Sequence, residues 1–134
     1  MVRARTLMAA AGLVLAVGLP AARAQTPYYA GKTIELVVPS AVGGATDILN
    51  RFLAPYLEKH IPGNPTVRIR NMPGGGSILG GNWFAANAKP DGLMLFASTV
   101  SSKVAYMMEN PAVRYDFRRM RLVAINGSGG VFYA

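Results

Sequence analysis

The chain has 134 residues, a formal net charge of +8, 51% hydrophobic residues and no cysteine. That length allows one domain, since domains typically have about 100 to 200 residues. The lack of cysteine excludes disulfides, thiolate metal sites, a cysteine nucleophile and a lipid anchor on an N-terminal cysteine. Charged residues are 15% of the chain, and 15 Gly and 9 Pro supply turns, so the composition indicates a globular, loop-rich protein.

The first 24 residues have the pattern of a Sec-type signal peptide. Two arginines precede an apolar stretch, 7–19, and an Ala-Arg-Ala sequence at 22–24 presents small residues where signal peptidase needs them. The apolar stretch is shorter than the about 20 residues of a membrane-spanning helix. We therefore expect a periplasmic, soluble mature protein that begins at Gln25 and carries no lipid anchor.

Removal of that segment leaves 11 basic and 6 acidic side chains and a net charge of +5. A nucleic-acid partner would need a basic surface interleaved with aromatic residues, and the candidate is the group of arginines within 114–121. A solvated face beside Tyr115 and Phe117 explains this group better. We expect no nucleic-acid partner.

The mature chain alternates short apolar runs with helical patterns, which predicts parallel βαβ units with right-handed crossovers. The first run is rich in β-branched residues and stops at Pro39, as a buried strand does. In the second, Val67 and Ile69 should point inward. Strands are predicted at 34–38, 66–71, 93–97 and 121–125, with a turn at 126–130 and a further strand beginning at 131–133.

Helical patterns fill the intervals between these runs, around 49–57, 78–88 and 103–109. Thr46 or Asp47 is placed to cap the first helix, and Ser77 to cap the second. Pro55 predicts a kink or a split in the first helix, because it lacks a backbone donor. Trp83 and Phe84 on the second helix are expected in the core.

Three polar loops follow the predicted strands, at 40–47, 72–77 and 98–102. Open parallel sheets bind ligands outside the carboxyl ends of their strands, so these loops are expected at one site. The first two are glycine-rich and lead into helix N-termini, where backbone N–H groups can hold a carboxylate or phosphate without Lys or Arg. The first loop is equally well explained as an ordinary turn with an N-cap.

Other chemistries find little support in the sequence. Dinucleotide and triphosphate motifs are missing, and Gly127-Ser128-Gly129 lacks the spacing of a nucleophile elbow. The single histidine, His60, lies in a proline-rich helix exit, and the six acidic residues are spread along the chain without a metal-ligand spacing. We expect no catalytic residue, no metal and no cofactor.

Five segments resemble the Bug family, the periplasmic binding proteins of tripartite tricarboxylate transporters. They follow the order and spacing of that family and cover essentially all of the mature chain. The segments are Leu-Val-Val-Pro-Ser-Ala-Val-Gly-Gly-Ala-Thr-Asp at 36–47, Arg51, Asn-Met-Pro-Gly-Gly-Gly-Ser at 71–77, Lys-Pro-Asp-Gly at 89–92 and Tyr-Asp-Phe at 115–117.

The resemblance implies an α/β fold like that of type II periplasmic binding proteins, which close two lobes over a small organic acid and deliver it to a membrane permease. Residues 25–134 would form the N-terminal part of the first lobe, with parallel βαβ units. In this family the ligand carboxylate is held mainly by backbone amides and water at strand-to-helix turns. The implied ligand-binding residues are Ser40, Ala41, Gly43, Gly44, Thr46, Asp47, Gly75, Gly76, Ser77, Ser98 and Thr99.

Two departures from the family pattern bear on this interpretation. Ser40 and Val42 replace an aromatic residue and a proline of many members, which leaves the identity of the ligand open. The chain also stops at Ala134, where members continue for well over a hundred residues. As a fragment it is expected to form no stable monomer and to bind ligand weakly. Two rival hypotheses are an α/β enzyme fragment acting on an anionic substrate and a truncated gene product without function.

Overall fold

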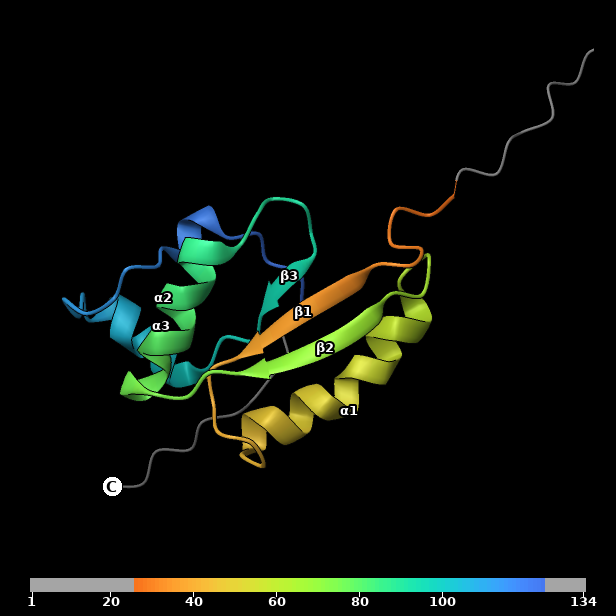
Figure 1. Ribbon diagram of the computed structural model, residues 1–134. Helices are drawn as coiled ribbons and strands as arrows, with labels where there is room; N and C mark the ends of the chain where they lie inside the picture. The colour runs from red at the N-terminus through yellow and green to blue at the C-terminus, as the bar shows by residue number, and fades with distance from the viewer. Residues whose placement is uncertain (1–25, 125–134) are drawn as a thin grey trace, which may run out of the picture.

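A computed structural model describes residues 26–124 of the chain, which form a three-stranded parallel sheet with helices (Figure 1). The strand order is β2-β1-β3. The strands are β1 (Thr33–Val38), β2 (Thr66–Asn71) and β3 (Met94–Phe96), and the helices are α1 (Ala45–His60), α2 (Ile78–Asn87) and α3 (Val100–Met107). The expected α/β fold with parallel βαβ units is confirmed, and it is consistent with part of a periplasmic-binding-protein lobe.

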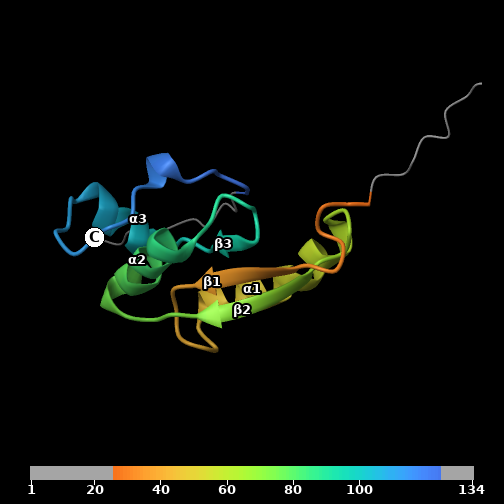
Figure 2. The same cartoon turned by 45° about the horizontal axis from the view of Figure 1, so that its top comes forward.

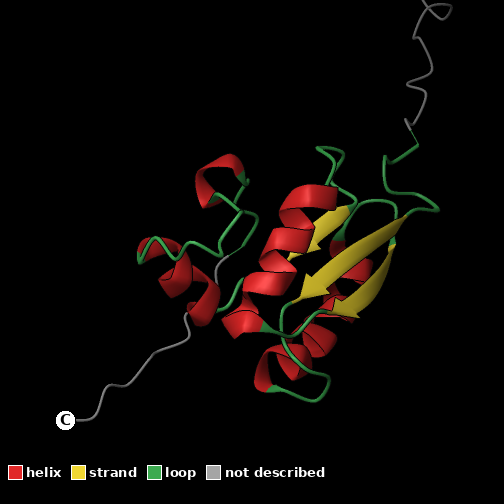
Figure 3. Ribbon diagram, turned by 60° about the vertical axis from the view of Figure 1, so that its left-hand side comes forward, coloured by secondary structure: helices red, strands yellow, loops and turns green. Residues whose placement is uncertain are grey.

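Helices cover both faces of the sheet (Figure 3). On one face, α1 packs through Ala54 and Leu57 on apolar residues of all three strands, among them Ile34 and Val67. On the opposite face, the ring of Phe84 in α2 stacks on Phe96 of β3 at 5.3 Å between centroids. The central strand is therefore buried from both sides, as its β-branched sequence predicts.

The edge strand β2 alternates as predicted. Val67 is buried and Ile69 half-buried beneath α1, while Arg68 and Arg70 are exposed. Arg70 lies over the ring of Trp83, 4.9 Å from its centroid. Trp83 is thus half-buried at the rim of α2 and is not a core residue, contrary to the prediction for it.

Helix α1 is one 16-residue helix that runs through Pro55. Of the two predicted effects of this proline, a kink or a split, the split is therefore wrong. Pro55 is exposed, and its missing N–H leaves the carbonyl of Arg51 on the outer side of the helix, where water is an alternative donor. Helix α3 begins three residues earlier than predicted. The reason is a capping box, in which the Thr99 hydroxyl accepts from the Ser102 N–H at 3.1 Å and the Ser102 hydroxyl accepts from the Thr99 N–H at 3.0 Å.

The segment after α3 differs from its prediction. Residues 121–124 are exposed and form no strand, although 121–125 was predicted as one. A short 3₁₀ turn, Phe117–Arg119, precedes them, and the Asp116 carboxylate caps it by accepting from the Arg118 N–H at 2.9 Å. The predicted signal peptide, the turn at 126–130 and the strand at 131–133 lie outside the described residues. Within 26–124, no helix has the length and apolar character to cross a membrane.

Tyr115 joins α2 to α3. Its ring is 3% exposed, and its hydroxyl donates to the Ser102 carbonyl at 2.7 Å. The ring packs so closely on α2 that a Cβ atom at Gly81 would lie 2.5 Å from its Cε1 atom. Glycine is needed here for close approach, and its φ is not in the left-handed region.

We predict that Gly81→Ala lowers the free energy of unfolding by about 1–3 kcal/mol through overpacking, although alanine is the better helix former. Urea denaturation measures the change. The cost should shrink in a Tyr115→Leu background, because the flexible leucine can move aside. An equal cost in both backgrounds would contradict the contact as its cause.

Candidate functional site

The carboxyl ends of the three strands lie at one edge of the sheet and bring the three predicted loops together (Figure 2). The Ser77 hydroxyl donates to the Pro39 carbonyl at 3.0 Å, which joins the second loop to the first. The Asn71 side chain donates to the Ser40 carbonyl at 3.1 Å. After β1 the chain continues to a helix on one face of the sheet, and after the neighbouring strand β3 it continues to a helix on the opposite face. Open parallel sheets bind ligands at such a topological switch point.

The first loop is a tight turn that leaves the start of α1 without a side-chain cap. The Gly44 N–H donates to the Ala41 carbonyl at 3.1 Å, and Gly43 adopts a φ of 80°. The N-cap is Gly44, with φ −71°, so the prediction of Thr46 or Asp47 as the cap is wrong. Among the residues that the structure describes, no acceptor bonds the N–H groups of Ala45 and Thr46. These uncapped donors carry the partial positive charge of the helix terminus.

The carboxylate of Asp47 ties this turn to its surroundings. Asp47 is 1% exposed, and one of its oxygens, Oδ2, accepts from the Gly43 N–H at 2.8 Å and from Arg51 Nε at 2.9 Å. The other, Oδ1, accepts from Asn71 Nδ2 at 2.8 Å. Arg51 also donates to Asn71 Oδ1 at 3.0 Å. We call Asp47, Arg51 and Asn71 the carboxylate cluster.

The cluster holds Asp47 in its charged form. Hydrogen bonds from Arg51, Gly43 and Asn71 lower the pKa of Asp47 from 3.8 to about 2, against the opposing effect of its burial. Asp47 is therefore a charged, enclosed group whose lone pairs are already engaged by the protein.

All three residues of the carboxylate cluster lie in the segments that resemble the Bug family, and Asp47 is a predicted ligand-binding residue. The sequence alone predicts no joint role for them. The i,i+4 spacing of Asp47 and Arg51 on one helix is a signal that could have found their ion pair. The separation of 24 positions between Asp47 and Asn71 carries no such signal, because only the parallel pairing of β1 and β2 brings Asn71 to this edge.

The second loop is an unusual stretch of left-handed backbone. Gly74, Gly75, Gly76 and Ser77 have φ values of 130°, 54°, 60° and 73°. Ser77 precedes α2 but makes no side-chain cap, so this predicted cap is also wrong. Its hydroxyl bonds Pro39, as above, and therefore holds the loop against the end of β1. Gly75 and Gly76 are exposed beside it.

The third loop is shorter than predicted, because Thr99 is the N-cap of α3. Its hydroxyl is engaged in the capping box, while Ser98 is half-buried at the end of β3. In the first loop, the Ser40 hydroxyl is buried and has no hydrogen-bond partner within residues 26–124. Ser40 is therefore a predicted site residue with a buried and unengaged hydroxyl.

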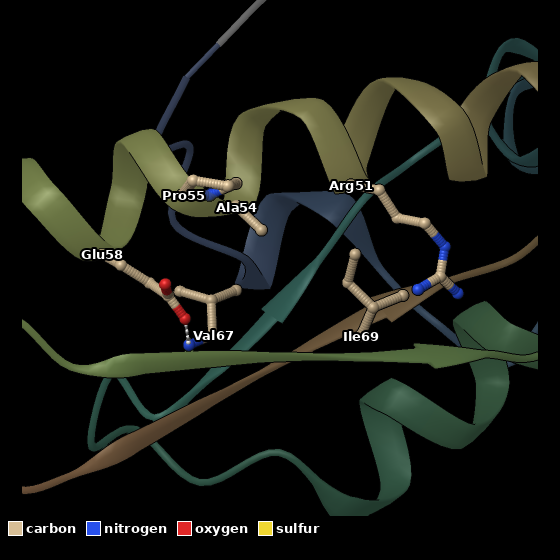
Figure 4. A pocket seen from close by; sticks show the side chains of 6 residues that line it. All are labelled: Arg51, Ala54, Pro55, Glu58, Val67 and Ile69. Atoms are coloured by element: carbon tan, nitrogen blue, oxygen red, sulfur yellow. Dashed lines mark hydrogen bonds between the residues drawn. The ribbon is translucent and has the colours of Figure 1, made fainter.

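The surface also has two hollows, and Arg51 of the carboxylate cluster helps to line the first of them. One, of about 300 Å³, lies between α1 and β2, where Glu58 accepts from the Val67 N–H at 2.7 Å (Figure 4). The other, of about 420 Å³, lies beside α2 around Trp83 and Arg114. Neither is lined by the predicted site residues. The described part of the chain also contains no group of three or more His, Asp or Glu side chains that could hold a metal ion.

Comparison with known proteins shows that the chain is similar in sequence to a bacterial protein. The chain is 33% identical to Protein BugT of Bordetella pertussis over 99 residues, which is 74% of this chain and 29% of BugT. The match thus spans less than a third of the length of that relative. No protein-family model matches the chain.

We predict that Asp47 makes the fold sensitive to acid. Its pKa is lower in the folded state, so its stabilising contribution is present above about pH 4 and is lost as the pH falls through about 2. Asp47→Asn should lower the Tm at pH 7 and flatten the decline of Tm between pH 4 and pH 2. Calorimetry across this range measures both effects.

The matched control is Glu109→Gln, which removes an exposed carboxylate beyond the end of α3 and should leave the Tm at pH 7 unchanged. If the D47N variant kept the steep acid decline of the natural protein, Asp47 would not be its source.

Proposed function

The chain belongs to the Bug family over the part that it shares with BugT, and from this premise we propose that it is a solute-binding protein that captures a small organic carboxylate. The observation that supports this ligand class is the uncapped start of α1 at the sheet edge. The free N–H groups of Ala45 and Thr46 lie there without a competing side-chain acceptor among residues 26–124. A carboxylate is the complement of such donors.

Arg51 is the basic side chain nearest in sequence to the start of α1, and its contacts support recognition of the ligand by backbone amides. Arg51 bonds Asp47 and Asn71, so two of its donors are directed to the protein, and the amides remain to meet the ligand. The Ser40 hydroxyl would add a donor from the turn, and Ser98 another from the end of β3. Gly75, Gly76, Ser77 and Thr99 would line the cleft, with Ala41 and Gly44 shaping the turn.

The same proposal covers location and partners. The N-terminal pattern supports export to the periplasm, and the family supports delivery of the ligand to the permease subunits of a tripartite tricarboxylate-type transporter. No catalytic step is proposed, because ligand capture by amides needs no acid, base or nucleophile.

Substitution at Ala45 tests the proposed contact directly. Ala45 is exposed at the first position of α1, where proline is well tolerated, and Gly44 has φ −71° and ψ 160°, which suits a residue before proline. Ala45→Pro thus removes one donor and preserves the helix. We expect the affinity for the preferred carboxylate to fall by about 10- to 100-fold, the value of a charge-assisted hydrogen bond.

The measurement is calorimetric titration of the intact protein with mono-, di- and tricarboxylates. Ala45→Val is the control, because it adds similar bulk and keeps the N–H; it should bind like the natural protein. Equal affinities in all three proteins would place the ligand elsewhere, and binding of none of the acids by the natural protein would refute the proposed ligand class.

Export is tested by the mass of the protein recovered from the periplasm. We expect a mature chain that begins at Gln25, since Ala22-Arg23-Ala24 meets the small-residue requirement of signal peptidase. Replacing Ala24 by a bulky residue should block this cleavage. A membrane-bound product that retains residues 7–19 would instead identify that segment as an anchor.

A further inference from the structure

The Asp47 carboxylate stands beside the proposed ligand site but is enclosed by donors from the protein. Asp47 is 1% exposed, and both of its oxygens accept hydrogen bonds from the protein. A ligand oxygen would gain nothing from this carboxylate, since like charges repel at short range. One of its contacts runs instead to the turn that precedes α1, and the others run to α1 and β2.

Three hydrogen bonds made by Asp47 and Asn71 fix the turn at both ends. Asp47 holds the Gly43 N–H at 2.8 Å from within the first turn of α1. Asn71 holds the Ser40 carbonyl at 3.1 Å from the end of β2, and it also donates to Asp47 at 2.8 Å. The turn is therefore bound to the helix at one end and to the sheet at the other.

Arg51 completes the arrangement. It donates to Asp47 Oδ2 at 2.9 Å and to Asn71 Oδ1 at 3.0 Å. One guanidinium therefore balances the buried charge and orients the amide of Asn71, so that the Nδ2 group of Asn71 faces both the carboxylate and Ser40. Planar guanidinium geometry suits such a double contact, and an ammonium group does not reproduce it.

We infer that Asp47, Arg51 and Asn71 act as positioning residues, which hold the turn at residues 40–44 in the conformation that keeps the first amides of α1 available to an anion and do not touch the ligand themselves. This inference rests on the proposed function. It also reassigns Gly43, whose N–H is held by Asp47 and is not available to a ligand.

A variant without the charge of Asp47 distinguishes the positioning role from a direct contact with the ligand. Asp47→Asn keeps the size of the side chain and removes a negative charge near a site for anions, so electrostatics alone would strengthen binding. A positioning role predicts the opposite. We expect D47N to bind succinate and citrate about tenfold more weakly than the intact natural protein, the effect of misplacing one charge-assisted hydrogen bond.

Arg51 provides a second variant for the case that D47N does not fold, because its side chain is 50% exposed. Arg51→Gln should weaken both ligands similarly, and Arg51→Lys should recover part of the loss by restoring the charge. The matched control is Arg70→Gln, since Arg70 is also 50% exposed and pairs with a carboxylate, Glu35, away from the loops. It should bind both acids like the natural protein.

Amide hydrogen exchange without ligand tests the positioning role independently of the proposed function. Exchange at residues 41–46 should accelerate in D47N and R51Q and stay unchanged in R70Q. Unchanged exchange, or equal or tighter binding by D47N, would overturn the inference. If the natural protein binds neither acid, the proposed function fails on its own, and the exchange rates alone decide whether the cluster holds the turn.

Discussion

The buried carboxylate of Asp47 is the constraint around which this end of the molecule is organised. A charge enclosed to 1% exposure has to be compensated by donors, and three are provided, from Gly43, Arg51 and Asn71. Each comes from a different part of the fold: the turn, the helix and the edge strand. The hydrogen bonds to this one carboxylate therefore join α1, β2 and the β1–α1 turn.

The parallel sheet makes that arrangement possible. Its order, β2-β1-β3, places Asn71 at the same edge as the turn after β1, although Asn71 lies 24 positions after Asp47 in the sequence. The side chain of Ser77 joins the glycine loop to the same edge through Pro39. Because the turn is held by side chains behind it, the first amides of α1 are left uncapped, and they are the feature that a carboxylate ligand would use.

The secondary structure was largely predictable from the sequence because apolar periodicity reports burial. Residues 34–38 and 66–71 form strands as predicted, and the i, i+3, i+4 pattern marks α1. The failures have local causes. The first four residues of the strand predicted at 121–125 remain exposed. The predicted caps of α1 and α2 were wrong because Asp47 bonds the N–H of Gly43, before the N-cap, and Ser77 bonds the carbonyl of Pro39.

The site was predictable as a set of loops but not as a set of contacts. Glycine and hydroxyl residues after three strands predicted loops that the parallel sheet places at one edge, whereas the direction in which Asp47 and Asn71 hydrogen-bond depends on tertiary geometry. The most direct test of the account is an ¹⁵N NMR titration of the intact protein with succinate and citrate. We predict saturable chemical-shift changes that are largest at the amides of Ala45 and Thr46. Shifts confined to the surface around Trp83, or none at all, would contradict it.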